Sequence, residues 1–153
     1  MKFVPQWRRF AALPPRKRAL LARAWLALAC ARLELAVAPF ALLRKQPRVS
    51  RTQGADAGSA AWAIRTAARF VPRATCLVQA LAAHRLLARL GYDSRLHIGV
   101  AKPPRNAPGA GNGPVEDWAS EFDAHAWVEY GGAVLVGVSE TRYTPLVQWS
   151  GAQ

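Results

Sequence analysis

Cys76 is the residue of this chain best placed to act as a nucleophile. It follows Thr75, a favourable helix N-cap, and opens the run CLVQALAAHRLLARL, which ends at Gly91 and predicts a helix. A cysteine in the first turn of a helix faces the positive end of the helix dipole and unpaired backbone N–H groups. These groups favour a thiolate and could stabilise the oxyanion of an acyl transfer. We therefore predict a nucleophilic role for Cys76; the alternative is a small buried hydrophobic residue.

A nucleophilic cysteine requires a base, and the chain contains three histidines. His84 lies in the same helix, about 12 Å along the axis from Cys76 at about 1.5 Å per residue, so we expect it to make packing or polar contacts and not to react. His97 and His125 lie in segments that alternate apolar and polar residues, as β-strands do. Composition and spacing do not choose between these two histidines.

The segments that must position these residues predict an α+β fold, with helices first and an antiparallel sheet after them. Helices are expected over residues 16–43, with an end or kink at Pro39, and over 59–71 and 76–90; strands are expected over 94–100, 122–130 and 133–138. Residues 102–119 are rich in Pro, Gly and Asn and predict a long surface loop, either a substrate lid or a tolerated insertion.

The composition is that of one globular domain, since 153 residues with 52% hydrophobic content can bury a sizeable core. Its two cysteines, Cys30 and Cys76, are too far apart in sequence to suggest a disulfide framework, so we expect a cytoplasmic protein. Cys30 lies among Leu and Ala and is expected to pack in the core. No signal peptide is visible, and charges interrupt the apolar stretch 19–43 before it could span a membrane.

The positive charge is concentrated near the N-terminus. Residues 1–51 hold twelve Lys and Arg and one acidic residue, whereas residues 52–153 hold nine Lys and Arg and eight acidic residues. We therefore divide the chain into a basic helical segment with its linker, 1–58, and a catalytic domain, 59–153. The basic segment predicts a docking surface for an acidic partner, nucleic acid or anionic lipid; the alternative is a solvated helix pair.

An ordered set of motifs resembles the transglutaminase-like maturation peptidases of lasso-peptide gene clusters. The motifs are a Cys-Leu helix start with an Arg-Leu-Gly end (76–91), a Leu-x-Ile-Gly-Val strand (96–100), an Ala-His-Ala-Trp-Val-Glu strand (124–129) and a late Tyr-x-Pro-Leu (143–146). Each motif alone is weak, but the ordered set, which covers about residues 72–146, is specific.

The resemblance implies a papain-like or transglutaminase-like fold in which the helix starting at Cys76 packs on a sheet that carries the base. It assigns Cys76 as nucleophile and His125 as general base for cleavage of a precursor peptide at its leader–core junction, with no metal or cofactor. His97 is then a strand-surface or substrate-groove residue. Trp127, on the same strand face as His125, either shields and positions the base or is a plain core aromatic.

The chain departs from this family at the third catalytic position. Many members carry an aspartate on the strand after the hairpin, and Gly137 occupies the matching place. A two-residue turn would pair Val138 with His125, and a one-residue bulge would shift this register. The orienting group could be a carboxylate, from Asp123, Glu129 or Glu140, or a backbone carbonyl or a water.

The resemblance also implies partners. They are the precursor peptide, a separate small leader-binding protein and an asparagine-synthetase-like cyclase. We expect dependence on the separate protein because no segment before Pro72 has the content of a leader-binding domain. The basic segment could dock either protein or touch a membrane surface, and nucleic acid is not expected. Two rivals stay open: a transglutaminase-like amidase or acyltransferase, and a non-catalytic basic binding module.

Overall fold

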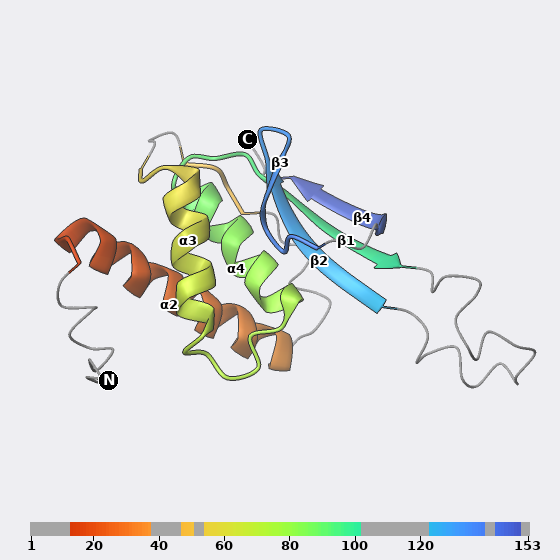
Figure 1. The fold of residues 1–153 in the computed structure, drawn as a ribbon, viewed down its shortest axis with the longest axis horizontal. Coiled ribbons are helices and arrows are strands. Elements are labelled where there is room, and N and C mark those ends of the chain that lie inside the picture. Colours follow the sequence, from red (N-terminus) through yellow and green to blue (C-terminus); the bar gives the residue numbers. More distant parts are fainter. Residues whose placement is uncertain (1–12, 38–46, 51–53, 102–122, 140–142, 151–153) are drawn as a thin grey trace, which may run out of the picture.

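A computed structural model describes residues 13–37, 47–50, 54–101, 123–139 and 143–150, and the structural statements below concern these residues. Three helices precede four strands: α2 (Pro15–Val37), α3 (Ala57–Ala68), α4 (Cys76–Arg89), β1 (Arg95–Ala101), β2 (Asp123–Tyr130), β3 (Ala133–Val136) and β4 (Thr144–Ser150) (Figure 1). The predicted α+β arrangement, with a helix that starts at Cys76, is confirmed.

Helix α4 has well-defined ends. Its N-cap is Thr75, whose side-chain oxygen accepts a hydrogen bond from the backbone N–H of Val78 at 3.4 Å. At the other end Gly91 adopts a φ of 89° and its N–H bonds to the Ala88 carbonyl. This left-handed C′ glycine closes the helix as the sequence predicts, because glycine adopts that conformation without a steric penalty.

The strands form one antiparallel sheet in the order β3-β2-β1-β4. The β2–β3 turn is made by Gly131 and Gly132, at φ values of 60° and 80°, the left-handed conformations that a tight hairpin turn requires. Glu129 pairs with Val134 but Val128 pairs with Val136, so Leu135 is an extra residue on β3. The sheet therefore has the bulged form of the hairpin, and Val138 does not take the place opposite His125 that an unbulged turn would give it.

The core lies between the helices and one face of the sheet. Helix α4 is the middle layer: it packs on β2 on one side and against α2 and α3 on the other (Figure 1). Its buried partners on the sheet come from alternate strand positions: Leu96, Ala126, Val128 and Val136. The intervening positions, including His97 and His125, therefore point to the other face of the sheet.

Several element boundaries differ from the predicted ones. Helix α3 begins earlier, because Asp56 caps it by accepting a hydrogen bond from the Ser59 N–H at 2.8 Å, and it ends at Ala68 instead of Val71. Strand β3 stops at Val136 because Gly137 has a φ of 83°. Strand β4 was not predicted. It contains Pro145, which cannot donate a ladder hydrogen bond and is tolerated because β4 is an edge strand.

Two predictions concern regions that are only partly described. Helix α2 ends at Val37 in the described chain, and residues 38–46 with the expected kink at Pro39 lie outside it, as does the predicted loop 102–119. Helix α2 shares the core with α3 and α4, and the division at residue 58 stays a prediction. Among the described helices, none combines the length and apolar character needed to cross a membrane.

Candidate active site

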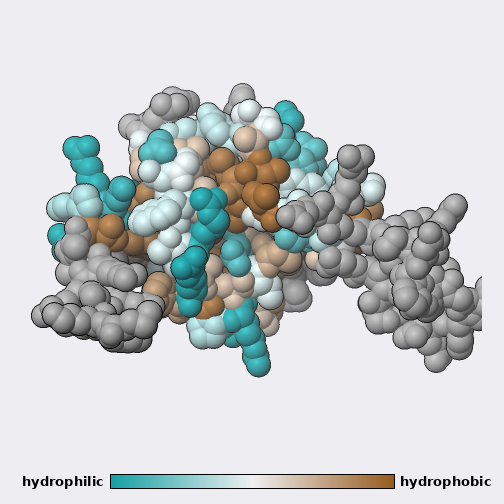
Figure 2. Space-filling view, viewed as in Figure 1, coloured by the Kyte–Doolittle hydropathy of each residue, from teal (hydrophilic) through white to brown (hydrophobic). Residues whose placement is uncertain are grey.

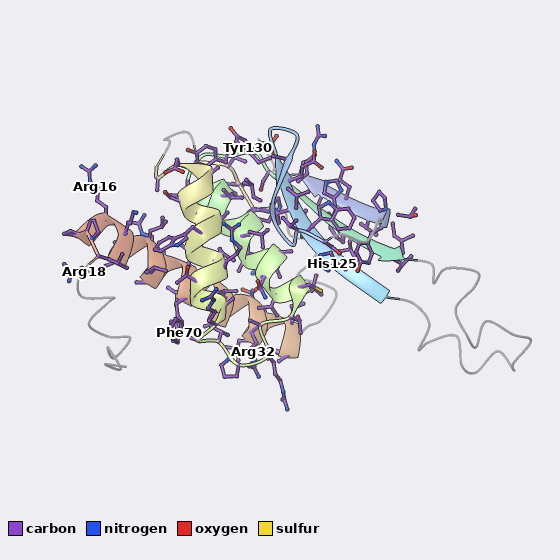
Figure 3. The ribbon with its side chains drawn as sticks, viewed as in Figure 1. Arg16, Arg18, Arg32, Phe70, His125 and Tyr130 are labelled. Carbon is purple, nitrogen blue, oxygen red and sulfur yellow. The ribbon has the colours of Figure 1, made fainter. Side chains whose placement is uncertain are left out.

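Cys76 is the first residue of α4 and is partly buried at the end of the helix that approaches β2. Its sulfur lies 4.0 Å from the backbone carbonyl oxygen of Ala124. The thiol therefore touches the peptide group that links Ala124 to His125, which places the predicted nucleophile at the beginning of the strand that carries the predicted base. Figure 3 shows the labelled His125 on β2, near the N-terminal end of α4.

The imidazole of His125 is held by a backbone group. Its Nε2 lies 2.8 Å from the carbonyl oxygen of Gly137. A carbonyl oxygen can only accept a hydrogen bond, so Nε2 carries the proton of this contact and Nδ1 of the neutral ring keeps the free lone pair. Nδ1, which is closer to the backbone than Nε2, is thus the nitrogen available to accept a proton from a thiol.

Aromatic rings line His125 on the open face of the sheet. The rings of His125 and Tyr143 stack at 4.9 Å, and those of His125 and Trp127 at 6.3 Å. On the same face of the sheet the row of rings continues from Trp127 to His97, whose rings are 5.1 Å apart and nearly parallel. Four rings therefore form one stack across the sheet, and the catalytic candidate lies inside it.

Gly99 makes room for this stack. It pairs with His125 across β1 and β2, and a β-carbon at Gly99 would lie 2.9 Å from Cη2 of Trp127 and 2.7 Å from the carbonyl oxygen of Thr144. The six-membered ring of the Trp127 indole therefore occupies space that a side chain at position 99 would need. Trp127 is only partly buried and fills this niche on the outer face of the sheet, so it borders the site and is not a plain core aromatic.

A shallow cavity of about 170 Å³ opens beside the imidazole. Its walls come from the aromatic stack, the end of β3 and the residues that follow β3: His125, Trp127, Val134, Gly137, Val138, Ser139 and Tyr143. Apart from the imidazole, none of these side chains is ordinarily charged. The cavity therefore suits an uncharged group next to the base.

Glu129, the candidate carboxylate whose side chain the structure describes, does not contact His125. Glu129 instead lies 3.4 Å from Nε2 of His97, in a contact without hydrogen-bond geometry. Burial lowers the pKa of His97, an effect that Glu129 partly opposes. The side chain of Asp123 and the whole of Glu140 lie outside the described residues. The group that contacts the His125 imidazole is the backbone carbonyl of Gly137, one of the alternatives that the sequence analysis left open.

The remaining candidates lie away from this site. His84 is buried in α4, with Nδ1 3.0 Å from the Ser94 hydroxyl, so the prediction that it is a packing residue is confirmed. Burial is the largest cause of its low pKa, about 4. Cys30 is exposed on α2, so the prediction that it packs in the core is wrong. Helix α2 is apolar on most of its circumference, which leaves no periodicity to show which face is buried.

The arrangement can support thiol chemistry once the thiol and the imidazole meet. Cys76 approaches β2 from the helix-covered side, whereas His125 extends from the open face, and among the described residues no hydrogen bond joins them. Contacts between catalytic groups are often long before substrate binds and tighten in the reactive complex. The backbone N–H groups of Cys76 and Leu77, at the start of α4, lie beside the sulfur and could bind an oxyanion, whereas the N–H of Val78 is bound by Thr75.

Comparison with known proteins gives one match. The profile of the transglutaminase-like superfamily matches residues 19–148, which include most of α2, all of α3 and α4, and nearly all of the described sheet. No curated protein and no solved structure shows a significant match to the chain.

Proposed function

Because this chain belongs to the transglutaminase-like superfamily, we propose that it is a cysteine endopeptidase that removes the leader from a lasso-peptide precursor. The observation that carries the proposal is the contact between the Cys76 thiol, at the N-terminus of α4, and the peptide group that precedes His125. The motif resemblance of residues 72–146 supports the choice of substrate. No metal or organic cofactor is required by this chemistry.

The reaction follows an acyl-enzyme route. Nδ1 of His125 takes the thiol proton while Sγ of Cys76 attacks the carbonyl carbon at the leader–core junction. The N–H groups at the start of α4 stabilise the oxyanion, and the imidazolium returns its proton to the leaving amine as the C–N bond breaks. Water, deprotonated by the imidazole, then hydrolyses the thioester. The leader leaves as a free acid and the core peptide as a free amine.

The cavity suggests where the core peptide lies. The imidazole must protonate the leaving amine, so the segment that departs passes on the imidazole side of the scissile bond. The cavity of about 170 Å³ is on that side and has aromatic and valine walls. We therefore place the first residues of the core peptide there and expect them to be uncharged.

Helix α2 is the proposed docking surface for the separate leader-binding protein. Leu26, Leu33 and Val37 recur on one face of α2 and are 54%, 68% and 78% exposed, opposite the face that packs in the core. The acidic residue of this segment, Glu34, pairs with Arg85, so the neighbouring arginines keep their positive charge available. An exposed apolar stripe with basic flanks fits an amphipathic partner surface with acidic flanks.

The test uses the precursor peptide, the chain and the leader-binding protein encoded beside it, with cleavage followed by mass spectrometry. We expect wild-type chain to release a leader with a free carboxylate, and Cys76→Ala and His125→Ala each to lose at least about 1,000-fold in rate. Cys30→Ala is the matched cysteine control; because Cys30 lies on the same exposed face of α2 as Leu26 and Leu33, it is assayed with saturating leader-binding protein, where it should cleave at the wild-type rate.

The rivals predict different products. An acyltransferase would give a leader fragment joined to an added amine in preference to the free acid. A non-catalytic module would release no fragment, and Cys76→Ala would change nothing. A short reagent that alkylates both a thiol and an imidazole should bridge residues 76 and 125 in the active protein. If the reagent modifies each residue but never bridges them, the proposed pair does not form.

A further inference from the structure

We infer that the backbone carbonyl of Gly137 replaces a carboxylate as the positioning group for His125, and that it sets Nδ1 as the catalytic base. This inference deepens the proposed function and rests on it. The sequence places glycine where a side chain would be needed to orient the imidazole, and the structure supplies the main chain of the same residue instead, with a Nε2-to-oxygen distance of 2.8 Å.

The backbone conformation of Gly137 orients its carbonyl toward His125. Its φ of 83° lies in the left-handed region, which ends β3 and turns the chain away from the ladder. A β-carbon at Gly137 would lie 2.5 Å from the carbonyl oxygen of Ala126 and 2.9 Å from Cα of Trp127. Both neighbours belong to the main chain of β2 and cannot move independently. Glycine is therefore required for the close approach that brings its carbonyl to His125.

The β-bulge sets the register of this approach. Because Leu135 is an extra residue on β3, the residues after it are shifted by one position relative to β2. Gly137 therefore does not have the partner on β2 that it would have in an unbulged hairpin. The carbonyl of Leu135 is bound by the side chain of Arg65 from α3, at 2.5 Å. Helix α3 thus anchors the bulge two residues before Gly137, so the positioning of the imidazole is tied to the helical layer.

A neutral carbonyl has a different effect from a carboxylate. It accepts the Nε2 proton and so selects the tautomer with a free Nδ1, but it adds no full negative charge beside the imidazolium. The imidazole of the Cys76–His125 pair is therefore oriented only by the geometry of this hydrogen bond and by the dipole of the Gly137 carbonyl. Substitution of Gly137 should act on orientation, and hence on kcat, more than on substrate binding.

The experiment compares Gly137→Ala with Gly132→Ala in the full chain. Gly132 has a similar φ of 80° but nothing within 4 Å of its β-carbon position, so it reproduces the backbone strain without the clash or the contact with His125. We expect Gly137→Ala to lower kcat about 10- to 100-fold with little change in KM, as loss of an orienting partner typically does. Gly132→Ala should keep the wild-type kcat.

Nitrogen NMR of ¹⁵N-histidine-labelled protein supplies a readout that needs no turnover. In wild-type chain and Gly132→Ala, His125 should be protonated at Nε2 and free at Nδ1, whereas Gly137→Ala should show mixed tautomers. Wild-type spectra with the proton on Nδ1 would overturn the inference even if Gly137→Ala fails to fold. So would a folded Gly137→Ala protein with the wild-type tautomer and kcat. If wild-type chain cleaves no precursor yet the tautomer depends on Gly137, the peptidase proposal fails and the positioning contact stands.

Discussion

His84 shows how burial separates the histidines of this chain by role. Its ring is 2% exposed, Nε2 has no hydrogen-bond partner among the described residues, and Nδ1 meets the Ser94 hydroxyl. Burial lowers its pKa from 6.5 to about 4, Asp93 opposes this change, and Arg85 adds to it. An imidazole in this environment is neutral at pH 7 and serves packing, whereas His125, at the sheet surface, is partly exposed and keeps a nitrogen available.

The low pKa of His84 predicts a loss of stability in mild acid. Because the folded pKa is below the unfolded one, the unfolded chain binds more protons between pH 6.5 and about 4. The stabilisation is complete above pH 6.5 and is lost as the pH falls toward 4, by about 3 kcal/mol in all and about 2 kcal/mol by pH 5. Urea unfolding at pH 7 and pH 5 should show this loss in the wild-type chain and a smaller loss in His84→Gln.

His97→Gln is the companion variant for this measurement. Burial also lowers the pKa of His97, but Glu129 partly offsets the effect. We therefore expect removal of His97 to reduce the pH dependence less than removal of His84. Equal losses of free energy between pH 7 and pH 5 in wild-type chain and His84→Gln would show that His84 does not titrate on unfolding.

Single residues also mark the limit of the sequence analysis. Cys76 was identifiable because a local signal, the N-cap at Thr75, fixes where α4 begins. A backbone carbonyl was one of the alternatives for the positioning group, but the sequence could not say which one, because any residue can offer a main-chain carbonyl and only the fold brings that of Gly137 to His125. Gly137 lies inside the predicted strand 133–138, at the position that the motif resemblance assigns to an aspartate, and its main-chain carbonyl makes the contact with His125 instead.

At the scale of elements, predictions held where the determinants are local. The ends of α4 and the β2–β3 turn follow from Thr75, Gly91 and the Gly131 and Gly132 pair, whose conformational preferences do not depend on tertiary contacts. The bulge at Leu135, whose carbonyl is bound by Arg65 of α3, was one of two possible registers, because alternation of residue types does not choose between them. Strand β4 was missed because its pattern contains a proline and its exposed edge position carries little periodicity.

The anchor between α3 and β3 gives a prediction at this scale. Arg65→Met removes the hydrogen bond to the Leu135 carbonyl, which water can partly replace because Arg65 is exposed. We expect a loss of about 1 kcal/mol in unfolding free energy and a fall in kcat of about 3- to 10-fold, smaller than for Gly137→Ala, with KM unchanged. Arg69→Met, an exposed change at the end of the same helix, is the control. A stability loss without a kcat effect would show that the anchor does not reach the active site.

At the scale of the whole molecule, two surfaces with different chemistry face different directions. The aromatic stack and cavity lie on the open face of the sheet, and α2 lies beyond the helices on the other side of the core (Figure 1). Figure 2 shows hydrophobic side chains interspersed with strongly hydrophilic ones over the helical part of the molecule. The labelled Arg16 and Arg18 project outward from α2 (Figure 3), and Arg32 of the same helix donates a hydrogen bond to the backbone carbonyl of Pro72. Docking on α2 would therefore leave the site open to the precursor.

A net charge of +12 makes the choice of partner testable. Two copies of this chain would repel each other through α2, so the apolar stripe calls for a partner of opposite charge. We expect the leader-binding protein to bind wild-type chain with an affinity that falls as salt rises, because screening weakens the contribution of the arginines. Leu33→Glu, which puts a negative charge on the stripe, should weaken binding at least about tenfold in calorimetry, and Arg23→Ala should reduce the salt dependence.

The decisive comparison is between the binding of the leader-binding protein to α2 and the reactivity of the Cys76 thiol. Neither α2 variant should change the rate at which the Cys76 thiol is alkylated, since the stripe is separated from the thiol by the helical core. Arg95→Ala, an exposed arginine on β1, controls for the general loss of charge and should bind as the wild type does. Vesicles containing anionic lipid and a DNA duplex serve as competing probes. If either probe binds α2 more tightly than the leader-binding protein does, and Leu33→Glu abolishes that binding, then the surface recognises lipid or nucleic acid and delivery of the precursor must occur elsewhere.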